Sequence, residues 1–244
     1  MIGATRVRPG APTYSSGGTL NSQHPAAVLF DMDGTLVDSE KLWTVALNDL
    51  TAHYGGTLSP EARLAMVGSD MAATMEILHA DLKQPWRDAA AGSAWLEERV
   101  AKLFVTGLQW RPGALALLRA VRAAAIPTAL VTSTGRSLVE VALDTLGRDS
   151  FDVVVCGDEV TATKPDPTPY LTAARLLGVP IGRCVAIEDS PTGVASALAA
   201  GAAVLAVPSE APIDPAAGVH LLESLTGVDL DVLAGLLTPL DLPR

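Results

Sequence analysis

Two aspartates, Asp31 and Asp33, stand one residue apart directly after an apolar run at 26–30. Gly34 and Thr35 follow them. One interpretation is ordinary turn chemistry, because an aspartate side chain bonds to nearby backbone and a glycine readily adopts a positive φ. The other is a functional site in which both carboxylates take part. A short motif cannot choose between the two, so the rest of the chain must decide.

Other polar side chains follow the apolar runs that read as buried strands. They are Thr132 and Ser133, Lys164, and the adjacent pair Glu188 and Asp189. Ligands of open α/β sheets lie at the carboxyl ends of the strands, so we expect these side chains to converge with the two aspartates. Carboxylates crowded together repel one another unless a cation binds them. A hard divalent ion with oxygen ligands, most simply Mg²⁺, fits such a cluster.

The apolar runs predict the elements that position these side chains. Near-continuous runs at 27–30, 128–132, 151–156, 184–187 and 203–207 are typical of strands buried on both faces. Helix signals lie between the later runs. They are a Ser137–Glu140 capping box ending at Gly147, Thr168 before Pro169 ending at Gly178, and Ser190 before Pro191 ending at Gly201. The alternation predicts an α/β fold with a doubly wound parallel sheet.

One connection is far longer than a crossover needs, since residues 31–127 separate the first two predicted strands. Apolar residues recur at helical spacing from Trp43 to Tyr54, and Pro60 follows a serine suited to cap a second helix. We therefore expect a small helical domain inserted into the sheet domain. The predicted division is 1–24 as a disordered extension, 25–42 with 109–244 as the α/β core, and 43–108 as the inserted helical domain.

Composition narrows the class of protein and of partner. The chain has 244 residues, 49% of them apolar and 18% charged, which suits a sizeable core. A formal net charge of −10 argues against nucleic acid or an anionic membrane as partner, but it leaves an anionic substrate open. Cys156 and Cys184 lie in apolar runs without metal-ligand spacing, which fits buried free thiols and a cytoplasmic location. No apolar stretch reaches the roughly 20 residues of a spanning helix.

The motifs together resemble those of the haloacid dehalogenase superfamily of phosphohydrolases. They appear in order as Asp-x-Asp-Gly-Thr-Leu at 31–36, an apolar strand ending in Thr132, Lys164 before Pro165, and Glu188 with Asp189. The resemblance covers the chain apart from 1–24 and implies a Rossmann-like core. The inserted helices are similar to the helical cap of the branch that holds phosphoglycolate phosphatase and β-phosphoglucomutase.

The resemblance implies a role for each motif residue. Asp31 would attack the phosphoryl phosphorus and form an aspartyl-phosphate, while Asp33 would protonate the leaving oxygen and later deprotonate water. Thr132 would hydrogen-bond a phosphoryl oxygen, and Lys164 would compensate the charge on Asp31 and the phosphate. The implied Mg²⁺ ligands are Asp31, Asp33 through its backbone carbonyl, Glu188 and Asp189.

The resemblance implies a Mg²⁺-dependent phosphatase of a small phosphorylated metabolite, with a sugar or polyol phosphate as the first expectation. The expected substrate-binding residues are Gly34, Thr35, Ser133, Trp43 and Ser69. Trp43 also suits the core of the helical insert.

Two alternatives to hydrolysis are a β-phosphoglucomutase-like phosphomutase and a catalytically retired phosphometabolite-binding protein. Trp43 and Met71 stand where those mutases carry a histidine and an arginine, which favours hydrolysis. The presence of Asp33 argues against a retired enzyme, because a binding protein has no need of an acid and base. We expect a monomer or a weak homo-oligomer.

Overall fold

The computed structural model describes residues 6–7, 24–215 and 218–237. Its centre is a seven-stranded sheet with the order β1-β4-β3-β2-β5-β6-β7. The strands are β1 (Arg6–Val7), β2 (Ala27–Phe30), β3 (Thr128–Val131), β4 (Val153–Val155), β5 (Cys184–Glu188), β6 (Ala203–Ala206) and β7 (Val219–Leu221). Strands β2 to β7 pair in parallel with their neighbours. The predicted doubly wound α/β sheet is therefore confirmed, with β2 at its centre.

The edge strand β1 corrects one expectation. Arg6 and Val7 pair antiparallel with Val154 and Val153, so these two residues are not part of a disordered extension. A two-residue strand leaves no periodic signal in the sequence, because periodicity needs several residues to appear. The remainder of the predicted extension, 1–5 and 8–23, lies outside the described residues.

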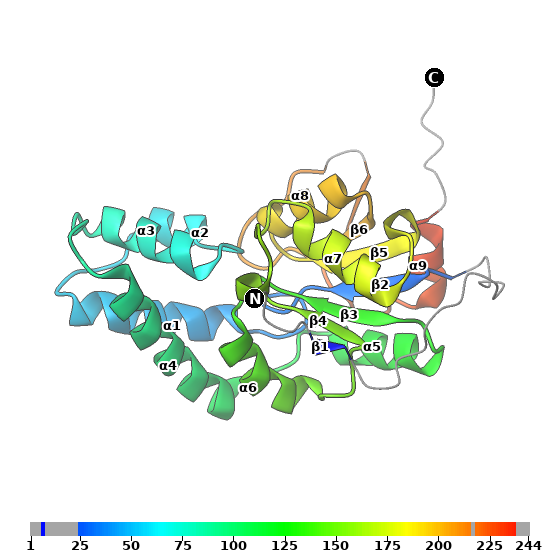
Figure 1. Ribbon diagram of the computed structural model, residues 1–244, viewed down its shortest axis with the longest axis horizontal. Coiled ribbons are helices and arrows are strands. Elements are labelled where there is room, and N and C mark those ends of the chain that lie inside the picture. The colour runs from blue at the N-terminus through cyan, green and yellow to red at the C-terminus, as the bar shows by residue number, and fades with distance from the viewer. Residues whose placement is uncertain (1–5, 8–23, 216–217, 238–244) are drawn as a thin grey trace, which may run out of the picture.

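Helices cover both faces of the sheet (Figure 1). Helices α7 (Thr168–Leu177) and α8 (Pro191–Ala200) lie on one side, and α5 (Ala114–Ala123) and α6 (Arg136–Leu146) lie on the other. Two short 3₁₀ helices, η1 (Gly157–Glu159) and η2 (Ile181–Arg183), and the terminal helix α9 (Leu230–Gly235) complete the core. Alternate residues of β2 face opposite sides, as in any strand. Val28 and Phe30 join one hydrophobic cluster and Ala27 and Leu29 the other.

The helix ends show where local prediction holds. Ser190 caps α8 by accepting the Gly193 N–H at 3.1 Å, and Gly201 ends that helix in the left-handed region, both as expected. The predicted capping box is wrong, because α6 begins at Arg136 with Gly135 as its N-cap. The Arg136 N–H finds its acceptor elsewhere, on Asp158 at 3.0 Å.

The start of α7 also differs from the prediction. This helix begins at Thr168 with Pro167 as its N-cap, one residue earlier than expected. The Asp166 carboxylate accepts the Thr168 N–H at 2.9 Å, so an aspartate outside the helix takes the capping role that the sequence analysis gave to Thr168.

Residues 40–107 of the long connection after β2 fold into four helices that extend from one end of the sheet (Figure 1). They are α1 (Glu40–His53), α2 (Pro60–Ala65), α3 (Met71–Asp81) and α4 (Ala89–Gly107). Leu47, Leu50, Leu96 and Phe104 are buried between them, and Trp43 packs edge-on against Phe104. Helix α1 begins three residues before the predicted boundary at 43, so it starts inside the segment expected to belong to the sheet domain. No helix in the described ranges is both long and apolar enough to cross a membrane.

Candidate active site

The site forms at the carboxyl ends of β2, β3 and β5, the central strands of the sheet. Asp31 follows β2 directly and is buried. Its Oδ1 accepts a hydrogen bond from Lys164 Nζ at 2.7 Å, whereas its Oδ2 is buried without a partner among the described residues. One oxygen of this carboxylate is therefore held, and the other is left for a group that is not part of the chain.

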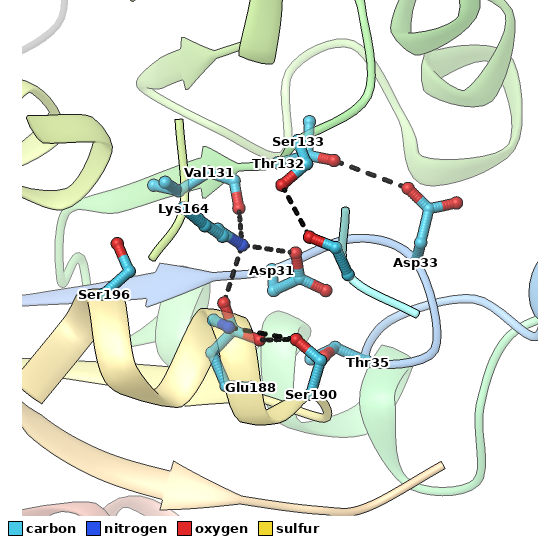
Figure 2. Close-up of polar contacts among 12 residues, drawn as sticks. Asp31, Asp33, Thr35, Val131, Thr132, Ser133, Lys164, Glu188, Ser190 and Ser196 are labelled. Atoms are coloured by element: carbon cyan, nitrogen blue, oxygen red, sulfur yellow. Dashed lines mark hydrogen bonds and ion pairs between the residues drawn. The ribbon is translucent and has the colours of Figure 1, made fainter. Parts of the chain in front are cut away.

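Lys164 lies at the centre of a buried ionic network (Figure 2). Its Nζ donates to Asp31 at 2.7 Å, to Glu188 at 2.6 Å and to the carbonyl oxygen of Val131 at 2.9 Å. Burial alone would lower the pKa of Lys164, but the two carboxylates outweigh it and hold that pKa above its usual value. The ammonium group therefore stays charged, with its three protons directed to three fixed acceptors.

Asp33 has different surroundings. Its Oδ1 accepts from Ser39 Oγ at 2.6 Å and from Trp43 Nε1 at 3.1 Å. Its Oδ2 accepts from Thr134 Oγ1 at 2.7 Å and from Thr132 Oγ1 at 3.4 Å. Side chains from the helical insert and from the end of β3 thus fix this carboxylate in one orientation.

Three carboxylates, including that of Asp31, lie close together at this end of the sheet. Ligand atoms of Asp31, Glu188 and Asp189 all lie within 4.8 Å of one another, and all three residues are buried. Burial, together with Glu188, raises the pKa of Asp31 to about 8 against the opposing effect of Lys164. Burial, together with the carboxylates of Asp31 and Glu188, raises the pKa of Asp189 well above its usual range. The donor set is all oxygen, and the crowding is relieved by a divalent cation, so the residues present fit such an ion.

The side chains around these carboxylates hold them in place. Asp189 accepts hydrogen bonds from Thr35 Oγ1 at 3.3 Å and from Ser209 Oγ. Gly34 has φ +75°, and a Cβ atom there would lie 2.0 Å from Asp189 Oδ2, so only glycine fits. Glu188 accepts from Tyr170 Oη at 2.5 Å as well as from Lys164.

Polar and apolar side chains of both parts of the chain line a cavity above the carboxylates. Of the five predicted substrate-binding residues, Ser133, Trp43 and Ser69 line it. Ser133 Oγ donates to the carbonyl oxygen of Gly68 at 3.2 Å, and Ser69 Oγ lies 2.9 Å from Thr74 Oγ1. Gly34 and Thr35 are instead placed beside Asp189, where they shape the carboxylate cluster.

Four residues of the site were not identified in the sequence analysis. Ser39 and Thr134 contact Asp33, Tyr170 contacts Glu188, and Glu40 lines the cavity. Thr134 could have been found, because it belongs to a run of three hydroxyl residues, Thr132-Ser133-Thr134, at the end of a strand. The other three approach from helices, and only the folded chain brings them to the strand ends.

Comparison with known proteins agrees with this arrangement. Residues 25–201 match the haloacid dehalogenase-like hydrolase family. Hexitol phosphatase A of Escherichia coli is 36% identical over 81% of this chain and 92% of its own length. Phosphoglycolate phosphatase of Chromobacterium violaceum is 32% identical over 77% of this chain and 87% of its own length.

A crystal structure of CbbY from Rhodobacter sphaeroides with bound phosphate aligns with a TM-score of 0.74 and 30% identity, over 83% of this chain and 96% of CbbY. CbbY has also been solved with xylulose-(1,5)-bisphosphate. The family match spans most of the chain and contains every predicted motif residue. The chain therefore belongs to the haloacid dehalogenase-like hydrolase family.

Proposed function

We propose that the protein is a Mg²⁺-dependent phosphatase that hydrolyses a small phosphorylated metabolite, a sugar or polyol phosphate, through an aspartyl-phosphate. The observation that carries this proposal is the contrast between its two aspartates. Asp31 has a buried oxygen without a partner beside the carboxylate cluster, and Asp33 is fixed by donors at the cavity wall. The named activities of the relatives, hexitol and phosphoglycolate phosphatases, support the same reaction class.

In the first step, the Asp31 carboxylate, held by Lys164 through Oδ1, attacks phosphorus. The new O–P bond forms as the bond from phosphorus to the ester oxygen breaks. The leaving oxygen takes a proton from Asp33, which lines the cavity together with Asp31. In the second step, Asp33 takes a proton from water, the water oxygen attacks phosphorus, and Asp31 is released with free phosphate.

The remaining residues stabilise charge and fix geometry. Lys164 offsets negative charge on Asp31 and on the phosphoryl group, and the hydroxyl groups of Thr132 and Ser133 are suited to donate to phosphoryl oxygens. Mg²⁺ would be held by the side chains of Asp31, Glu188 and Asp189 and by the backbone carbonyl of Asp33. When bound, the ion supplies positive charge that balances the carboxylates and the incoming phosphate.

The phosphomutase alternative is weaker on one specific observation. The Trp43 indole N–H donates to Asp33 at 3.1 Å from the helical insert, with no substrate needed to bring Asp33 into position. A mutase must keep water from the phosphorylated enzyme while its intermediate turns over, which favours an acid and base that acts only when sugar is present. A permanently placed Asp33 favours capture by water.

We further propose that the enzyme acts in the cytoplasm as a monomer or weak homo-oligomer, without nucleic acid or membrane partners. The net charge of −10 supports the absence of polyanionic partners. The free thiols Cys156 and Cys184 support a reducing compartment.

The test is phosphate release from a panel of polyol phosphates, hexose 6-phosphates, glucose 1-phosphates and phosphoglycolate, with MgCl₂ and with chelator. We expect release from at least one sugar or polyol phosphate, and its loss in chelator. The same reactions with glucose 1-phosphates are followed for glucose 6-phosphate. Formation of that product faster than free phosphate would establish the mutase instead.

A further inference from the structure

The cavity above the carboxylates has an unbalanced charge on its walls. Four acidic residues line it: Asp31, Asp33, Glu40 and Asp189. The proposed reaction uses three of these, and Glu40 remains unexplained. Lys164 is the one basic residue among the described residues of the lining, and its ammonium group is already bound to Asp31 and Glu188. A substrate entering this cavity therefore meets the Glu40 carboxylate and, among the described residues of the lining, no cationic side chain that is free of a carboxylate partner.

Glu40 is held in place by Arg63, a residue that does not line the cavity. Arg63 of α2 donates to Glu40 Oε2 at 2.6 Å and to the Glu40 carbonyl oxygen at 3.2 Å, and its Nε donates to Thr44 Oγ1 at 2.8 Å. The same guanidinium group pairs with Glu210 Oε2 at 2.8 Å. The single positive charge of Arg63 is thus shared by the carboxylates of Glu40 and Glu210, and these three side chains together carry a net negative charge. Glu40 Oε1 has no hydrogen bond to any described residue, which leaves it able to accept from a ligand.

The rest of the described lining supplies no further cationic side chain for a second anion. Leu47, Met66, Met71 and Leu138 are apolar. Ser69 and Thr74 supply hydroxyl groups, which bind other hydroxyls well but carry no charge. A carboxylate or second phosphate on the leaving group would lose its water and lie near Glu40 unpaired, and desolvated like charges repel strongly.

We infer that Glu40 is a specificity-determining residue that selects substrates whose leaving group is a neutral polyol or sugar and rejects those that carry a second anionic group. This inference rests on the proposed phosphatase reaction and names the substrate class that the same site accepts. Glu40 Oε1 accepts a hydrogen bond from a substrate hydroxyl, and the same charge repels a carboxylate at that point.

Two pairs of phosphate esters test the inference because each pair differs in one terminal group. Glucitol 6-phosphate and 6-phosphogluconate are equal in chain length, with CH₂OH in the first and carboxylate in the second. Glycerol 3-phosphate and 3-phosphoglycerate differ in the same way. We measure kcat/KM for each ester from phosphate release in MgCl₂. In the wild-type protein, kcat/KM for the neutral ester should exceed that for the acidic ester by at least about 10-fold. One close charge produces an effect of this size at moderate dielectric.

The variant Glu40→Gln keeps the shape and removes the charge, and Arg63 retains Glu210 as its partner. We expect kcat/KM for the acidic ester to rise and the ratio to fall by roughly 10-fold. A damaged fold cannot raise an activity, so the rise identifies a specificity effect. Glu40→Asp keeps the charge and should keep the ratio above that of Glu40→Gln. The matched control is Glu61→Gln, which removes an equal charge from the exposed first turn of α2 and should leave the wild-type ratio unchanged.

A second variant covers the case in which Glu40→Gln does not fold. Met71→Lys adds a cation to the lining of the same cavity and should raise kcat/KM for the acidic esters while Glu40 itself is unchanged. A wild-type ratio near one overturns the inference, as does an unchanged ratio in Glu40→Gln or, where that variant does not fold, in Met71→Lys. Equal release from both members of a pair leaves the phosphatase itself established. Release from none of the four esters or of the wider panel overturns the proposed function instead.

Discussion

At the scale of single residues, Asp31 divides its two oxygens between Lys164 and the carboxylate cluster. Asp31→Asn should lower turnover by roughly 10³-fold or more, because an amide is a poor nucleophile and a poor ligand for Mg²⁺. The fold should survive, since the amide keeps the shape and Lys164 keeps Glu188 as its partner at 2.6 Å. Steady-state phosphate release and thermal unfolding of the purified variant measure the two effects. Near-normal turnover in a preparation free of other phosphatases would rule out the covalent route.

Trp43 has two contacts that one substitution can separate. Its ring packs edge-on against Phe104 with centroids 6.4 Å apart, and its N–H donates to Asp33. Trp43→Phe retains an aromatic ring and removes the donor. Because Asp33 keeps three hydroxyl donors, we expect kcat to fall by about 3- to 10-fold with little change in KM. Trp86→Phe, at a side chain that is 76% exposed, is the control. A change in KM alone would show that Trp43 binds substrate and does not position Asp33.

At the scale of elements, polar bridges join the helical insert to the sheet domain around the cavity. Asp70 caps α3 with Oδ1 and accepts from Thr163 Oγ1 with Oδ2 at 2.7 Å. Thr163 precedes Lys164, so this bridge ties the insert to the loop that carries the lysine. Thr163→Val removes a hydrogen bond with a net contribution of about 1 kcal/mol. The population of molecules in which the insert has separated from this loop should therefore rise roughly 5-fold. Faster amide exchange at 66–71 would show this, against a Thr106→Val control whose hydroxyl bonds only within α4.

The elements and the site differed in how far the sequence could predict them. Asp31 and the 188–189 pair were predictable, because each lies at the end of an apolar run and parallel strands bring such positions to one edge. Lys164 lies further along the loop that follows the run at 151–156. Tyr170 and Glu40 were not, since a helix residue that reaches a site is indistinguishable in sequence from one that packs. The error at Ser137 has a similar cause. Asp158, a residue of another element, supplies the acceptor at the start of α6, and this tertiary contact outweighed the local capping signal.

At the scale of the whole molecule, the carboxylate cluster links stability to pH and to metal. Burial and Glu188 raise the pKa of Asp31 to about 8, far above the usual value of 3.8. Between these values the folded metal-free protein holds a proton that the unfolded chain has released. The free energy of unfolding is therefore highest, with respect to this group, below about pH 4, and it falls as the pH rises toward 8. A divalent cation that binds the ionised carboxylates would restore at high pH the stability that is lost with the proton.

We therefore expect the melting temperature in chelator to fall between pH 5.5 and 8, and millimolar MgCl₂ to raise it more at pH 8 than at pH 5.5. Thermal unfolding at the two values, with and without MgCl₂, measures both effects. Asp31→Asn is the matched control, because its amide does not titrate and the dependence on pH should be weaker. CaCl₂ should stabilise the folded chain as well, since calcium also takes oxygen ligands, yet its longer bonds and higher coordination number suit the reaction poorly. Stabilisation by either ion that is equal at both pH values would mean that the ion binds away from Asp31.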